Sequence, residues 1–250
     1  MQQDNNNATS TAIITHNTGS ALLAYADAMA PRTIVGSLVK FVKGDFFVGE
    51  DGEPLAEGTV FTVNLDELMA GWVHWEGGQP TEHIMVRVAD GRPSPKRSAL
   101  GDIDEANWEI DSTGNPRDPW QFTNYAPMLD EAGNLYTFAT SSRGGLAAIG
   151  DLIRVYVASR KMFPDDHLMV KLEVGSYAHK NRAYGRIKVP KFTPVGHTPK
   201  ASFDAALMTA GVPVAERAVP KPALPIEIEL NDSIPDFGEE PPPANLADFQ

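Results

Sequence analysis

Between Arg32 and Lys200 the sequence alternates short runs of β-branched and aromatic residues with turn-forming Gly, Asp and Pro. Each run has the length of a strand and each break supplies the backbone freedom of a turn, so the pattern predicts a mainly β domain. The expected strands are 33–42, 45–49, 58–65, 71–75, 83–89, 120–128, 134–140, 167–178 and 185–192. The stretches 49–54 and 130–134 have the Gly and Asp content of hairpin turns.

One segment, residues 141–161, breaks the strand pattern. It places apolar side chains at helical spacing and offers Ser141 or Ser142 as an N-cap. The apolar stripe consists of Leu146, Ile149, Ile153 and Tyr156, widened by Leu152 and Val157. A sheet-dominated domain with one main helix between strand pairs favours a small barrel. We therefore predict an OB-like five-stranded barrel or half-open barrel with added hairpins.

Composition divides the rest of the chain. We expect a flexible arm at 1–18, a short helix and linker at 19–31, the β domain at 32–200, a second short helix and linker at 201–220, and a disordered, acidic, Pro-rich tail at 221–250. The tail holds seven acids against the lone Lys221, and so supplies −6 of the net charge of −12. Such a segment cannot build a core.

The residue inventory excludes several kinds of chemistry. The 250 residues contain no cysteine, which removes disulfides, thiolate zinc sites and cysteine nucleophiles. The six histidines show no HxxxH or HExxH spacing, so we predict neither a metal nor a cofactor. No GxSxG elbow, Walker loop or GxGxxG is present either, and we predict that the protein is not an enzyme. The amino terminus lacks the charged-then-apolar pattern of a secretory signal, and no apolar run is nearly long enough to span a membrane. Both features favour a soluble cytoplasmic protein.

A basic stretch stands out in this acidic chain. Residues 174–203 contain no acid and six cations, namely Lys180, Arg182, Arg186, Lys188, Lys191 and Lys200. If they share one surface, that surface attracts anions. The alternative is a solvated hairpin whose cations pair with acids elsewhere, for instance the cluster Asp102, Asp104, Glu105, Glu109 and Asp111. Strand alternation predicts Arg186 and Lys188 on one face and Ile187 and Val189 on the core face.

Together these patterns suggest a nucleic-acid groove. Cations would neutralise phosphates and aromatic rings would stack on bases. The candidate residues are Lys40, Lys43, Arg143, Tyr177, Lys180, Arg182, Tyr184, Arg186, Lys188, Lys191, Trp72, Trp120, Phe122 and Tyr136. Arg143 lies in the turn 140–145, which leads into the helix and either holds a phosphate there or simply turns the chain. For each sheet aromatic a core position is the commoner alternative to stacking.

The combination of a basic β domain and an acidic tail resembles a known class of proteins. A β domain with a basic aromatic strand, followed by the tail stretches SIPDF (233–237) and LADFQ (246–250), is similar to the single-stranded-DNA-binding proteins of bacteria and their phages. The resemblance implies an OB fold and a tail that recruits replication or recombination proteins, or occupies the DNA groove when DNA is absent. The implied partner-binding residues are Ile234, Phe237, Leu246 and Phe249. Residues 118–152 also resemble uncharacterised phage and prophage proteins.

The expected function is therefore single-stranded DNA binding with little sequence preference in phage replication or recombination, in the host cytoplasm and away from membranes. The sequence leaves open whether the protein forms a homo-oligomer. One alternative is a phage structural or accessory protein whose β domain binds protein. A second is a phosphoesterase in which the acids between Asp102 and Asp118 hold a divalent metal, although their spacing does not match an EF-hand.

Overall fold

The structure is a computed structural model that describes residues 34–49, 51–111, 114–179, 182 and 185–212. The chain divides into residues 1–33 and 34–250, and all of the described residues belong to the second unit. The arm, the helix expected near 20–30 and the acidic tail lie outside the described residues. Within them, no helix is both long and apolar enough to cross a membrane.

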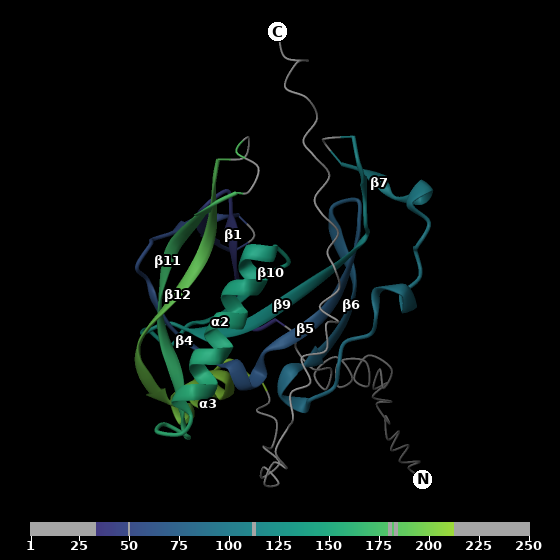
Figure 1. The fold of residues 1–250 in the computed structure, drawn as a ribbon. Helices are drawn as coiled ribbons and strands as arrows, with labels where there is room; N and C mark the ends of the chain where they lie inside the picture. Colours follow the sequence, from purple (N-terminus) through teal and green to yellow (C-terminus); the bar gives the residue numbers. More distant parts are fainter. Residues whose placement is uncertain (1–33, 50, 112–113, 180–181, 183–184, 213–250) are drawn as a thin grey trace, which may run out of the picture. The chain divides into compact units, whose positions relative to one another are not determined.

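The described residues are mainly β structure, as the sequence predicts (Figure 1). The strands are β1 (Ser37–Val42), β2 (Asp45–Val48), β3 (Glu53–Leu55), β4 (Val60–Val63), β5 (Met69–Glu76), β6 (Gln79–Arg87), β7 (Glu109–Ile110), β8 (Pro116–Arg117), β9 (Trp120–Leu129), β10 (Leu135–Thr140), β11 (Asp166–Ala178) and β12 (Arg186–Pro199). The α-helices are α2 (Arg143–Ser159) and α3 (Lys200–Thr209). Short 3-10 turns are η1 (Leu65–Glu67), η2 (Val88–Asp90), η3 (Arg97–Ala99) and η4 (Glu105–Asn107).

Ten of the strands form one sheet. Its main path runs β12-β11-β4-β9-β10-β1-β2-β3. The long strand β9 pairs with β10 along one edge, and along the other with β4 at Met128 and Leu129 and with β5 from Trp120 to Tyr125. Figure 1 shows β9 running from the part that contains β4 and β10 to the part that contains β5 and β6.

The sheet is strongly curled but its ladder is not closed. Three strands separate β10 from β12 along the path, yet the rings of Phe138 and Phe192 lie 5.1 Å apart across the interior. In the described residues β12 pairs with β11 alone, and its Pro190, Pro194 and Pro199 suit an end strand because proline has no N–H to donate to a neighbour. The sheet therefore has ten strands and is open, where the sequence predicted an OB-like five-stranded barrel or half-open barrel, and the OB fold is not confirmed.

The main core fills the inside of the curl. Apolar side chains from the sheet, including Phe61, Met128 and Leu172, pack with α2. The predicted helical stripe is largely confirmed, since Ile149, Leu152 and Tyr156 are buried. Val157 is a correction: it is 60% exposed, because it lies at the margin of the stripe and turns away from the sheet. Ser142 caps α2 as predicted, its Oγ accepting from the Gly145 N–H at 3.1 Å.

An ion cluster joins both helices to the sheet. The Nζ of Lys200, at the start of α3, lies 2.7 Å from Asp66 in η1, and the Tyr156 hydroxyl of α2 donates to the same carboxylate at 2.9 Å. Burial by itself raises the pKa of Asp66, but the hydrogen bonds from Lys200 and Tyr156 outweigh it, so the pKa is lowered. Lys200, one of the six cations of the acid-free stretch, is therefore a buried, paired residue rather than a surface charge.

The segment between β6 and β9 packs against the part of the sheet that β5, β6 and β9 form, which we call the β5–β6–β9 region. Arg97 holds it together through a bidentate pair with Asp118, at 2.7 and 2.8 Å. The indole N–H of Trp72 donates to the Pro95 carbonyl at 2.8 Å, and that of Trp120 donates to Asp102 at 3.0 Å. Both tryptophans are consequently buried in the β5–β6–β9 region.

Candidate nucleic-acid interface

The β11–β12 hairpin exposes Arg186 and Lys188 as predicted, but the predicted core face of this strand is a correction. Phe192, which packs in the core, shares the face of Lys188, whereas Ile187 and Val189 share the face of Lys191. Arg186 and Lys188 are exposed, whereas Ile187 and Val189 are half-buried. The Arg186 guanidinium donates to the Ser176 hydroxyl across the strand pair at 2.8 Å, which fixes its direction on the hairpin. Tyr177 lies opposite Ile187 and is 47% exposed. Arg182 is exposed, and Lys180 and Tyr184 lie outside the described residues.

The turn between β1 and β2 reaches this hairpin. A Cβ placed on Gly44 would lie 2.1 Å from the Cδ of Lys188, so the turn backbone rests directly on that side chain. Gly44 and Lys43 both have positive φ, at +95° and +53°. Glycine accommodates both the conformation and the close approach. Lys43 is thereby placed beside Lys188, although the two are far apart in the sequence.

The start of α2 reaches the same strand. A Cβ on Gly144 would lie 2.5 Å from a methyl group of Val189, so the first turn of α2 packs against the residue that follows Lys188. Arg143, the first residue of α2, is exposed at this point. Three segments therefore meet at β12: the turn 43–44 lies against the Lys188 side chain, and the start of α2 lies against Val189, whose side chain is on the other face of the strand. We call their exposed cations, Lys43, Arg143, Arg186 and Lys188, the basic rim.

The basic rim is not neutralised by acids within the described part of the chain. None of its four cations forms an ion pair there. In segments 40–45, 140–145 and 174–191 the one acid is Asp45. A surface of this kind attracts anions, and its attraction weakens as salt rises.

Two other predicted cations lie apart from the rim. Lys191 pairs with Glu173 at 3.1 Å, and Lys171 pairs with the same carboxylate at 2.6 Å. Lys171, Thr193 and Lys191 together lower the pKa of Glu173 to about 2. Lys40 is exposed between Val39, which is buried, and Phe41, so it points away from the core.

The predicted stacking aromatics are mostly core. Trp72 and Trp120 are each 5% exposed, so their rings cannot stack on a base, and the core alternative is correct for both. Phe122 packs edge-on against Trp72, and Tyr136 packs against Phe61. The Tyr136 hydroxyl donates to Asp130 at 3.1 Å, and burial together with that carboxylate raises its pKa. Tyr177 is thus the exposed ring among the described candidates.

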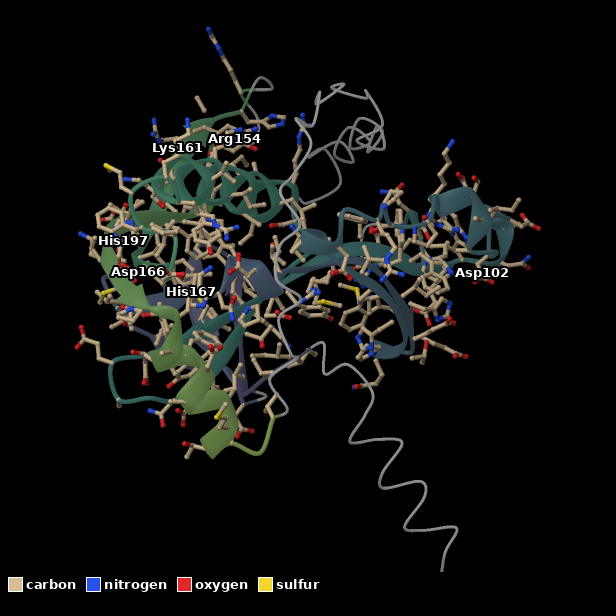
Figure 2. All side chains as sticks on the ribbon, turned by 90° about the horizontal axis from the view of Figure 1, so that it is seen from below. Asp102, Arg154, Lys161, Asp166, His167 and His197 are labelled. Atoms are coloured by element: carbon tan, nitrogen blue, oxygen red, sulfur yellow. The ribbon has the colours of Figure 1, made fainter. Side chains whose placement is uncertain are left out.

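In the described residues, no ion pair joins the basic stretch to the predicted acidic cluster of Asp102, Asp104, Glu105, Glu109 and Asp111. Asp102 instead contacts the β5–β6–β9 region: its carboxylate lies 3.6 Å from His74 and accepts a hydrogen bond from the indole N–H of Trp120. Figure 2 shows Asp102 at the β5–β6–β9 region, well apart from Arg154 of α2. Across the described ranges, no three His, Asp or Glu side chains gather closely enough to hold a metal ion.

Sequence reasoning missed the two glycines that assemble the rim. Gly44 and Gly144 carry no charge, but each removes the Cβ that would keep its segment away from β12. Gly44 follows a lysine in a hairpin and Gly144 stands in a Gly-Gly pair at a helix start, patterns that predict a turn and say nothing of a distant partner. Comparison with protein families, curated proteins and solved structures finds no match to this chain.

Proposed function

We propose that the protein binds single-stranded DNA through the basic rim, with little sequence preference. The observation that carries the proposal is that Lys43, Arg143, Arg186 and Lys188 are exposed on three separate segments that meet at β12, without an ion-paired acid among the described residues. Exposed cations of this kind neutralise phosphates, and Tyr177 supplies a ring for stacking. A role in phage replication or recombination, and an OB-like ancestry for the curled sheet, belong to the same proposal.

The acidic tail has two roles in this proposal. Its charge of −6 competes with DNA for the rim, and its apolar residues Ile234, Phe237, Leu246 and Phe249 dock to replication or recombination proteins. Competition of this type is electrostatic, so it is strongest at low salt.

A fluorescence titration with labelled oligo-dT at two salt concentrations tests the proposal. We expect binding at about 50 mM salt and a marked loss at about 200 mM, because each neutralised phosphate releases counterions. A labelled duplex of equal length is the control, since stacking requires unpaired bases. Absence of oligo-dT binding at the lower salt concentration would exclude this function.

A second candidate is an accessory or structural protein that binds another protein. The observation that favours it is the exposure of large apolar side chains: Val157 and Met162, at the end of α2, are 60% and 75% exposed, and Val195 of β12 is 51% exposed. Such residues mark interaction surfaces when they gather. Loss of a protein partner after Met162→Asp, with oligo-dT binding unchanged, would assign that surface to protein recognition.

A further inference from the structure

An open cavity of about 580 Å³ lies between α3 and the sheet. Its walls come from β4, the β9–β10 turn, β11, the end of β12 and one face of α3. The α3 face consists of small residues three or four positions apart, namely Ser202, Ala205, Ala206 and Thr209. Two acids, Asp130 and Glu131, stand in the wall at the β9–β10 turn. The space accepts several apolar side chains, and its acidic side favours a cationic occupant.

The chain leaves the described part of the molecule beside this cavity. At the end of α3, Gly211 has a φ of +67°, its N–H donates to the Met208 carbonyl at 3.0 Å, and the Val212 N–H donates to Leu207 at 2.9 Å. This is a Schellman turn, which folds the chain back over the helix it ends. Val212 packs on the cluster of Val35, Leu129, Phe203 and Leu207, together with Ala206. Leu129 and Ala206 belong also to the cavity wall.

The next residues, 213–224, differ in chemistry from residues 225–250, which hold all seven acids of the tail. The stretch PVAERAVPKPAL (213–224) carries Arg217 and Lys221 against one acid, Glu216, so its net charge is +1. Val214, Val219 and Leu224 are its larger apolar side chains. Its prolines favour an extended backbone, which suits a groove more than a helix face. Residues 225–250, with seven acids and no cation, would instead be repelled by Asp130 and Glu131.

We propose that residues 213–224 dock in this cavity as a strap, with Val214 and Val219 against the small-residue face of α3 and the two cations beside Asp130 and Glu131. The strap fixes where the acidic tail begins, because residues 225–250 then start from the cavity instead of from the end of α3. This inference concerns the chain's own packing and does not depend on DNA binding.

Thiol labelling of the full chain tests the strap. The protein contains no cysteine, so Ala205→Cys introduces a single thiol in the cavity wall. We expect maleimide to react with it about tenfold more slowly than in the same chain carrying Val214→Asp and Val219→Asp, because labelling then requires the strap to open. Ala147→Cys, exposed on α2, is the matched thiol and should react at the same rate in both backgrounds.

A charge exchange checks the pairing without touching an apolar residue. Glu131 is exposed in its turn, so Glu131→Lys leaves the fold intact and should accelerate labelling of Cys at 205. Adding Arg217→Glu and Lys221→Glu should restore the slow rate. Equal rates in the unsubstituted strap and the Val214/Val219 variant would overturn the proposal. Acceleration by Ile234→Asp and Phe237→Asp would assign the cavity to the distal tail, and protection that rises with protein concentration would assign it to a second copy; either result also overturns the strap.

Discussion

Gly44 rests against the aliphatic stem of Lys188, close enough that a Cβ on the glycine would lie 2.1 Å from the lysine Cδ. This contact joins the β1–β2 turn to the end strand β12 without a hydrogen bond between them in the described residues. It places Lys43 beside Lys188 and so builds one side of the basic rim. The absence of a side chain is therefore what brings two charges together.

Gly44→Ala should destabilise the protein and displace Lys188. The positive φ costs about 1–2 kcal/mol for a residue with a Cβ, and the steric conflict with Lys188 adds to that cost. Gly49→Ala is the matched control, because Gly49 has a φ of +74° but nothing within 4 Å of the added Cβ. Urea unfolding should show the larger loss at Gly44, and Lys188→Ala should recover the difference. Equal losses at the two glycines would mean that the turn does not rest on Lys188.

Replacing Arg186 and Lys188 together by alanine should weaken oligo-dT binding and lower its salt dependence. Each lost phosphate contact reduces the log–log slope by about 0.7, so the pair should reduce it by about 1.4. Lys96→Ala with Lys161→Ala removes the same charge from exposed sites outside the rim and should leave the slope unchanged. A similar fall in both variants would show that net charge alone, and not the rim, governs binding.

Tyr177→Ala should weaken oligo-dT binding by about 1–3 kcal/mol, the contribution of one stacked base. Trp120→Phe serves as the comparison. Its ring is buried and its indole N–H binds Asp102, so it should lower the melting temperature while leaving DNA affinity nearly unchanged. The reverse pattern in titrations and thermal melts would return the stacking role to Trp120.

Deleting residues 221–250 should raise DNA affinity at low salt, because the tail's charge of −6 then no longer competes for the rim. The gain should shrink as salt screens the competition. Replacing the seven acids by their amides in the full-length chain separates charge from length and should give a similar gain. Unchanged or weaker binding of the deletion variant would contradict competition by the tail.

Asp66→Asn should destabilise the protein by about 3 kcal/mol, because it leaves the buried Lys200 without its counter-charge. Asp151→Asn removes an exposed pair with Arg154 and should cost less than about 0.5 kcal/mol. The pKa of Asp66 is lowered in the folded state, so its stabilising contribution is complete above its ordinary value of 3.8 and is lost as the pH falls towards the lowered pKa. Unfolding curves in that acidic range should show a smaller pH dependence in Asp66→Asn than in the unsubstituted protein.

Local pattern was sufficient to predict most individual elements. The strands at 71–75 and 134–140 and the helix at 141–161 are found within a few residues, since alternation and helical spacing depend on neighbours in the chain. The short strands β3, β7 and β8 were not predicted, because two or three residues are too few to show a period. Val157 was misassigned because a helical stripe gives a direction but not the width of the surface that covers it.

The sequence by itself determined the mainly β class, the alternation that exposes Arg186 and Lys188, and the absence of cysteine chemistry, since these depend on residue type and short-range spacing. Only the tertiary structure decided that the sheet is open, that Trp72 and Trp120 are core, and that Lys200 is paired with Asp66. It also decided which cations gather, through Gly44 on Lys188 and Gly144 on Val189. The physical reason is distance along the chain: such contacts join segments whose meeting depends on how the whole sheet curls, and no local pattern records that curl.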